Sequence, residues 1–467
     1  MKLRLKEKIG YGFGDAASCL FWKLFSMYLM FFYTDIFGIS AGAVGTMFLI
    51  TRIWDAAFDP LVGILGDRTQ TRWGKFRPYL LWMAGPFAFM GVLTFTTPAF
   101  SAGGKLVYAY VTYSFMMMIY SLINVPYASL MGVMTTDSKE RTTLATFRFI
   151  FAFGGSLVVL ALAEPVSGFF SHLGGTLNLQ RGWQLTALVF GIMAAGLFLL
   201  TFAWTTERVK PVAEKTSLRL DLADLGRNGP WFVLLGAGIA TIFFNSIRDG
   251  AAMYYFKYYL KTNDAFSWPA LHVTLSWSSL YFVLGQAANI IGVILAKPIS
   301  DRIGKKHTFF AAMLSATGFS CLVYGVGPES VAAIMWLQCA ISTSAGFVFP
   351  LLWSMYADTA DYSEWRTGRR ATGLVFSASS MSQKFGWTLG GSFAGWILAW
   401  YDFHANQDQA ANTLTGIRMM VSLYPAIGAL VSGLFMLIYP LAENKVQQIE
   451  AELSARRQTV GSPATAS

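Results

Sequence analysis

Charged residues, cysteines and histidines are scarce in this chain. Asp, Glu, Lys and Arg together make up 13% of its 467 residues, whereas average soluble domains carry about 25%. So little charge does not suit a surface in water, and the composition therefore indicates a polytopic membrane protein. The three cysteines lie within apolar stretches and form neither a disulfide framework nor a metal-ligand spacing.

Other absences exclude whole classes of function. The four histidines are scattered, mostly near the ends of apolar stretches or in loops, without the spacing of metal ligands. This pattern argues against an enzyme built on a His or Cys site, and we expect no resident metal or cofactor. The sequence has no nucleotide-binding glycine loop, which argues against transport driven by ATP. The basic N-terminus leads directly into an apolar segment, so we expect no cleavable signal peptide.

Long apolar runs are what the sequence has in abundance. A helix that crosses a membrane needs about 20 mostly apolar residues, and twelve segments meet this requirement. We therefore predict an all-α polytopic membrane protein with twelve transmembrane helices. The predicted spans are 9–33, 41–64, 79–98, 105–133, 145–170, 183–204, 230–260, 272–299, 307–327, 330–357, 372–402 and 415–441.

The positive charge is distributed unevenly between the predicted loops. When the N-terminus is placed inside the cell, nearly all Lys and Arg clusters fall in cytoplasmic loops and in the tail. Cytoplasmic loops of membrane proteins carry such an excess of positive charge, so both termini are predicted to be cytoplasmic. The net charge of +10 is therefore mainly a topology signal, and we expect no nucleic-acid partner. The lipid bilayer is the predicted surrounding, and we expect the protein to function as a monomer.

The two halves of the chain repeat a loop motif. Asp67-Arg68 closes the second predicted span, and Asp301-Arg302 closes the eighth, 234 residues later. Two six-helix halves with matching loops are typical of transporters built from parallel repeats, whose substrate site lies between the halves. We predict an N-terminal half 1–204, a cytoplasmic middle loop 205–229, a C-terminal half 230–441 and a cytoplasmic tail 442–467. The tail is interpreted as one short charged helix followed by a disordered segment.

The second predicted span contains an unusual group of charges. Arg52, Asp55 and Asp59 are spaced i, i+3 and i+7, so they share one face of a helix. Charged residues inside a membrane cost several kcal/mol each and mark ion or substrate pathways. This face is therefore predicted to hold a proton or another cation.

Six motifs resemble the glycoside–pentoside–hexuronide:cation symporters, the melibiose permease type of the major facilitator superfamily. The resemblance covers both halves and implies the major facilitator fold, alternating access, and uptake of a sugar coupled to H⁺, Na⁺ or Li⁺. It also implies a bacterial cytoplasmic (inner) membrane location. The motifs are Tyr11–Asp15, Tyr33–Asp35, Arg52–Pro60, Arg72–Pro78, Asn124–Tyr127 and Ala357–Tyr362.

The resemblance implies a cation site on Asp55 and Asp59. Ser121 offers a hydroxyl where the family has threonine, and Lys384 matches a lysine that neutralises the acidic pair when the cation is absent. Phe58 stands where the family pattern has asparagine and supplies no ligand oxygen, which favours a proton over Na⁺. Both ions remain open here, as does the alternative that the acids only pair with basic residues to pack helices.

The resemblance also implies a sugar site around Arg148, whose planar fork can hold two hydroxyls or a carboxylate. The family's carboxylates are absent at Cys19 and Asn124, and Lys23 is added one turn beyond Cys19. A neutral glycoside is slightly favoured over an anionic one, a uronide or a sulfonated sugar, and the alternative for Lys23 is a pair with Asp15 or another acid. A sugar sensor that does not transport is a further alternative. Other candidate sugar contacts are Tyr120, Tyr127, Trp353 and Gln383.

The charged loop residues are candidates for an inner gate. Their charges can pair in one state of the transporter and separate in the other, or they can simply anchor the loops at the membrane surface. The candidates are Asp67, Arg68, Arg72, Asp301, Arg302, Asp358 and Asp361.

Overall fold

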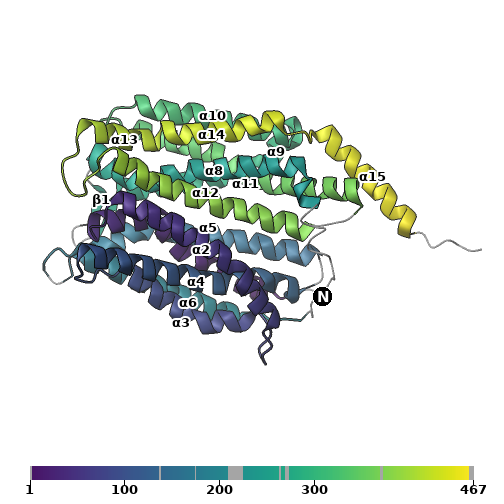
Figure 1. Cartoon of the computed structure of the whole chain (residues 1–467), viewed down its shortest axis with the longest axis horizontal. Coiled ribbons are helices and arrows are strands. Elements are labelled where there is room, and N and C mark those ends of the chain that lie inside the picture. The colour runs from purple at the N-terminus through teal and green to yellow at the C-terminus, as the bar shows by residue number, and fades with distance from the viewer. Residues whose placement is uncertain are drawn as a thin grey trace, which may run out of the picture. The chain divides into compact units, whose positions relative to one another are not determined.

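The computed structural model describes residues 3–135, 138–173, 175–208, 224–261, 264–268, 273–368 and 372–461. Long helices make up most of these residues, with one short hairpin (Figure 1). The chain divides into two compact units. The first unit consists of Met1–Ala213, Asp249–Val283 and Gly391–Ile417, and the second of Glu214–Arg248, Leu284–Gly390 and Arg418–Ser467.

The first unit contains the six helices of the N-terminal half. Its first helix begins as α1 (Leu5–Leu24) and continues through two π-helical turns, η1 (Phe25–Leu29) and η2 (Phe32–Ile36). α1 packs closely against α5 and α6, and α3 packs against both α4 and α6. The other helices are α2 (Ala41–Arg68), α3 (Arg77–Thr94), α4 (Ala102–Met134), α5 (Ser138–Ser171) and α6 (Leu179–Trp204).

Local sequence signals explain where several of these helices begin and how closely they pack. The Asn178 side chain accepts the N–H of Arg181 at 2.9 Å and caps α6. Pro78 stands in the first turn of α3, where its missing N–H costs nothing. Gly155 of α5 lies against the backbone of Ala16 in α1. A Cβ at position 155 would stand only 2.8 Å from the Ala16 carbonyl oxygen, which is too close. A small residue is therefore needed at this crossing.

The second half of the chain is also helical, and α8, α9, α12 and α13 contribute residues to both units. Within the second unit, α10 packs against α11 and α14, and α11 packs against α15. The elements are α8 (Gly229–Tyr254), π-helical η3 (Tyr255–Leu260), α9 (Trp277–Ile303), α10 (Lys305–Gly325), α11 (Val331–Thr367), α12 (Thr372–Trp400), α13 (Ala411–Val421), α14 (Leu423–Ile438) and α15 (Glu443–Gly461).

In the part of the chain that the structure describes, each of the twelve predicted spans is helical over most of its length, which confirms the fold class. Within the described residues, eight helices are long and apolar enough to cross a membrane by length and composition. Large apolar side chains are exposed on several of them, for example 63% of Ile192, 67% of Ile294 and 77% of Trp336. Water would disfavour such surfaces, whereas a bilayer accepts them. The chain is a multi-pass membrane protein.

A short antiparallel hairpin precedes α9, where we had predicted helix from residue 272. β1 (Asp264–Trp268) pairs with β2 (Val273–Ser276), with Trp268 opposite Val273 and an irregularity between Asp264 and Phe266. The helix starts only at Trp277, because Val273, Thr274 and Leu275 favour an extended strand. β2 packs against α5.

The short charged helix predicted at the start of the tail is α15, which is longer than expected, and residues 462–467, where the disordered segment was predicted, lie outside the described residues. α15 is a helix of 19 residues that diverges from the direction of α14 (Figure 1). The Trp365 indole N–H donates to Glu452 at 2.6 Å, and the Lys445 ammonium lies 4.9 Å from the centre of the same ring. These contacts hold α15, a polar helix with little apolar surface, against α11.

Candidate functional site

The acidic pair of α2 meets α4 at a single hydroxyl. Ser121 Oγ lies 2.8 Å from Asp55 Oδ1 and 2.7 Å from Asp59 Oδ1. Asp55 is 1% exposed and Ser121 is 2% exposed. Two carboxyl groups one helical turn apart thus converge on one side chain of the neighbouring helix.

Ser121 has fewer hydroxyl hydrogens than it has short contacts to carboxyl oxygens. A serine hydroxyl has one hydrogen to donate and two lone pairs to accept with, so Ser121 can donate to one carboxyl only. The second contact is a hydrogen bond when the other carboxyl carries a proton and donates to Ser121. Two ionised carboxylates would leave one short oxygen-to-oxygen contact without hydrogen, and would also repel each other.

Arg52 and Pro60 add to the surroundings of the pair. The Arg52 Nη1 lies 3.9 Å from Asp55 Oδ2, and its guanidinium is 4.7 Å from the centre of the Trp22 ring. Pro60 has no N–H, so the carbonyl oxygen four residues earlier in α2 lacks its usual helical donor. Phe58 lies on α2 between the two acids and supplies no oxygen.

A second ion pair, partly buried, joins α1 to α5. Arg148 Nη2 donates to Asp15 Oδ1 at 3.2 Å, and Arg148 Nε lies 3.2 Å from Asp15 Oδ2, a two-pronged arrangement. The guanidinium stands 5.4 Å from the centre of the Tyr127 ring. The Asp15 carboxylate therefore balances the charge of Arg148 in this structure.

The aromatic and polar candidates of α4 line the same region with different roles. Tyr127 is fully buried, stacks on Tyr11 at 4.8 Å and donates its hydroxyl to the Tyr11 carbonyl at 2.7 Å. Its ring face is thus occupied by protein. Asn124 accepts from Ser18 at 2.8 Å and donates to the carbonyl of Tyr120 at 2.9 Å.

Lys23 and Cys19 lie on α1, both partly buried. Lys23 forms no ion pair with any described residue, and the carboxylate of Asp15 is engaged by Arg148 instead. The alternative that Lys23 pairs with Asp15 or another acid stays a prediction. Lys23 lies on the same helix as Asp15, eight residues further along α1.

The remaining predicted site residues belong to the second unit. Trp353 of α11 contacts the Tyr356 ring edge-on at 6.0 Å. Gln383 and Lys384 of α12 are partly buried, and the Lys384 carbonyl accepts from Thr388 at 2.7 Å. Their part in the cation and sugar sites remains a prediction.

The loop after α2 wraps around a carboxylate at the end of α6. Glu207 accepts the backbone N–H groups of Lys75, Phe76 and Arg77 at 2.8, 2.7 and 2.9 Å. Gly74 has φ of 111°, and a Cβ there would lie 2.5 Å from the Glu207 carboxyl carbon, so both conformation and space require glycine. Among the gate candidates here, Arg68 and Arg72 are exposed and Arg72 lies over the Trp73 ring, while the Asp67 side chain lies outside the described residues.

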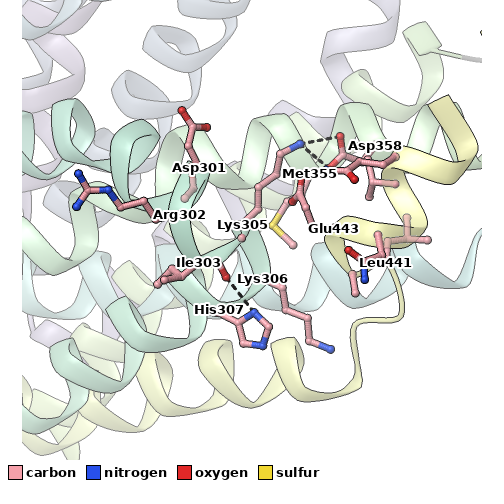
Figure 2. A pocket seen from close by; sticks show the side chains of 16 residues that line it. Asp301, Arg302, Ile303, Lys305, Lys306, His307, Met355, Asp358, Leu441 and Glu443 are labelled. Atoms are coloured by element: carbon pink, nitrogen blue, oxygen red, sulfur yellow. Dashed lines mark hydrogen bonds and ion pairs between the residues drawn. The ribbon is translucent and has the colours of Figure 1, made fainter. Parts of the chain in front are cut away.

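The matching loop in the second unit pairs differently. Lys305 contacts both carboxylate oxygens of Asp358 at 2.9 and 2.8 Å beside a cavity of about 550 Å³ (Figure 2). Lys306 donates to the Tyr439 carbonyl at 2.7 Å. Asp301 pairs with Lys297 at 2.9 Å on the exposed side of α9. Arg302 also lines this cavity, whereas Asp361 lies on α11, one turn beyond Asp358.

Glu7 forms a polar junction at the beginning of α1. It accepts the Arg4 N–H at 2.9 Å, the Thr206 hydroxyl at 3.0 Å and the Arg208 guanidinium at 2.5 Å. Burial raises the pKa of Glu7, but these hydrogen bonds outweigh burial and hold the pKa below its ordinary value of 4.5. The ionised carboxylate therefore stabilises the folded protein.

We expect Glu7→Gln to destabilise the purified protein by about 1–3 kcal/mol at neutral pH, because buried donors lose a charged acceptor. A lowered folded-state pKa means that the stabilisation is present above pH 4.5 and is lost as the pH falls below it. The difference in melting temperature between wild type and variant should therefore shrink below that pH. A difference that stays constant across the pH range would contradict this assignment.

Sequence reasoning missed a cluster at the opposite end of the first helix. Asp35, with its side chain 1% exposed, accepts Lys257 Nζ at 2.6 Å and the Tyr258 hydroxyl. Asn406 donates to the Asp35 carbonyl at 2.6 Å and accepts from Lys257 at 2.7 Å. One carboxylate thus joins η2, η3 and the loop between α12 and α13. The motif Tyr33–Asp35 contained this acid, but no partner is visible from sequence.

This fold and these intramembrane charges define a membrane transporter of the major facilitator type. The profile described as MFS/sugar transport protein matches residues 10–443, and the chain belongs to this family. It is 37% identical over 453 residues to the isoprimeverose transporter of Lactiplantibacillus pentosus, covering 96% of this chain and 90% of the relative. It is 36% identical over 454 residues to the inner membrane symporter YicJ of Escherichia coli (strain K12), covering 97% and 95%.

A solved structure agrees on the fold. The crystal structure of the nucleoside transporter NupG superposes with a TM-score of 0.62 at 12% identity, covering 94% of this chain and 100% of that one. The chain is thus a sugar transporter and symporter by family, and its family is not one of enzymes.

Proposed function

We propose that this protein imports a neutral glycoside together with a proton, by alternating access across the bacterial inner membrane. The observation that carries the proposal is the single Ser121 hydroxyl shared by Asp55 and Asp59. Because one hydroxyl hydrogen serves two carboxyl contacts, a proton on one acid completes the hydrogen bonding. Gain and loss of this proton would change the charge between α2 and α4.

The number of oxygen ligands around Asp55 and Asp59 also supports a proton over a sodium ion. A sodium ion is held by several oxygen ligands, as other hard cations are. Phe58 offers none, and the Ser121 hydroxyl is already in direct contact with both carboxyl groups. A proton needs only the oxygens that are present.

The charge balance around Arg148 supports a neutral substrate. Asp15 neutralises Arg148, so this pair offers a sugar both hydrogen-bond donors and acceptors without net charge. The relative named isoprimeverose transporter carries the name of an uncharged sugar. Tyr120 and Asn124 would contribute further contacts from α4.

An anionic sugar is the second candidate, and Lys23 is the observation that favours it. Among the described residues this amine has no acidic partner. A uronide or sulfonated sugar would supply the missing negative charge. If Lys23→Gln leaves the affinity for a uronide unchanged, this candidate is excluded.

Uptake into membrane vesicles tests the proposal. A panel of neutral and anionic glycosides is offered with and without Na⁺, under an imposed pH gradient and at constant membrane potential. We expect sodium-independent uptake of a neutral glycoside that collapses on addition of a protonophore. Stimulation by Na⁺ at constant potential would contradict proton coupling, and binding without uptake would indicate a sensor.

The topology is proposed on the same basis. The inner membrane symporter YicJ supports an inner-membrane location, and the excess of Lys and Arg in alternate loops supports cytoplasmic termini. Lys384 is proposed as counter-charge to the acidic pair, and the inner loop charges as a gate. We propose that one chain is sufficient for transport.

A further inference from the structure

Glu164 is an acidic residue on a membrane helix that the proposed mechanism does not use. It lies on α5, seven residues before the helix ends at Ser171, within the candidate span Thr143–Ser171. Ser278 donates to its two carboxyl oxygens at 3.0 and 2.9 Å, and Ser276 donates to Oε2. These serines stand at the end of β2 and the beginning of α9, so one carboxyl joins α5 to the start of the eighth span.

Hydroxyl groups, and not cations, surround this carboxyl. None of the ion pairs among the described residues involves Glu164. Of the described groups, only the Tyr28 phenol of η1 is titratable and faces it. α6 presents the uncharged Trp183 ring beside Tyr28, at 5.2 Å. An ionised carboxylate here would be a charge on a membrane helix balanced by dipoles alone, which is unfavourable.

The contacts between oxygens around Glu164 outnumber the hydroxyl hydrogens that the two serines can donate. Ser276 Oγ and Ser278 Oγ lie 2.9 Å apart while both also contact the carboxyl. Ser276 Oγ already accepts the Ser279 N–H at 3.0 Å. Two serine hydrogens cannot complete all the contacts of this group. A hydrogen on the carboxyl supplies the missing donor.

Two further buried hydroxyls lie beside the carboxyl without a hydrogen bond of good geometry to any of the described residues. Tyr28 and Ser279 are both fully buried and face Glu164 closely enough to interact with its carboxyl, but their oxygens do not reach the geometry of a regular hydrogen bond to it. Unsatisfied buried polar atoms are rare and indicate a group or state that they serve. They are positioned to donate to the carboxyl once it loses its proton.

We propose that Glu164 is a proton-binding site separate from Asp55 and Asp59. The protonated carboxyl joins α5 to β2 and α9 through Ser276 and Ser278. Loss of the proton to water leaves a carboxylate, which Tyr28 and Ser279 then stabilise while the contact to the serines rearranges.

Infrared difference spectroscopy on the full chain in nanodiscs tests this proposal. The measurement is made on the Asp55→Asn/Asp59→Asn variant, in which these two residues can no longer contribute a carboxylic acid band. The infrared signal does not require transport. We expect a carbonyl stretch of a protonated carboxylic acid at neutral pH, which fades on alkalinisation with about a tenfold change in the protonated-to-ionised ratio per pH unit. Adding Glu164→Gln should remove this titrating band.

Ser278→Ala serves as the matched variant, because it keeps the acid and removes one hydrogen bond, so the band should shift in frequency and persist. If the Asp55→Asn/Asp59→Asn variant does not fold, the same subtraction is made between wild type and Glu164→Gln. A titrating band that survives Glu164→Gln, or the absence of any acid band at neutral pH, would overturn the proposal. Neither result bears on proton coupling at Asp55 and Asp59, which vesicle uptake decides separately.

Discussion

An Asp55→Asn or Asp59→Asn variant should bring sugar to equal concentrations on both sides of the membrane without accumulating it. The amide cannot release and rebind a proton, so sugar movement is no longer linked to the ion gradient. One elementary charge moved across 100 mV supplies about 2.3 kcal/mol, which corresponds to about a 50-fold sugar gradient. The variants should lose this accumulation entirely while exchange of labelled sugar persists.

Asp408→Asn is the matched control for this experiment. Its side chain is 96% exposed and pairs with Lys261, another exposed residue, so the substitution removes a carboxylate of no expected importance. Accumulation should be unchanged. Full coupled uptake by Asp59→Asn would remove that residue from the cation role.

Breaking the Asp15–Arg148 pair is expected to have the second large effect. Arg148→Gln leaves the partly buried Asp15 carboxylate without its counter-charge, which costs about 3–5 kcal/mol of stability. The double variant Asp15→Asn/Arg148→Gln removes both charges and should recover most of that stability. Sugar affinity should nevertheless fall about 10–100-fold in the double variant, because one or two hydrogen bonds to charged groups are lost.

Thermal unfolding and equilibrium sugar binding separate the two effects. Stability should return in the double variant while binding does not. If the double variant binds sugar as well as wild type, the pair only fastens α1 to α5 and takes no part in recognition.

The helices were predictable because each span is a long apolar run, and length alone identifies such runs in a membrane protein. The length of the helix in the tail could not be predicted in this way. α15 is polar, and its order depends on Trp365 meeting Glu452, a contact that no local pattern reveals. The hairpin before α9 was missed because its apolar residues merged with those of the following helix.

The candidate site was partly visible from spacing. Asp55 and Asp59 share a helix face, and the structure adds that Ser121 touches both. Pairings between distant helices could not be derived, so the ion pair between Arg148 and Asp15 was not predicted. Glu164 was overlooked because a single acid in an apolar helix has no periodic pattern around it.

The π-helical turns carry a consequence for the Asp35–Lys257 ion pair. Both partners lie within such turns, Asp35 in η2 and Lys257 in η3. A π turn holds one residue more than an α turn, so a shift of its hydrogen bonds to α spacing would turn the side chains beyond it by about 100°. The ion pair thus depends on backbone register at both of its ends. A one-residue deletion in η2 or η3 would separate the charges while leaving every charged side chain in the sequence.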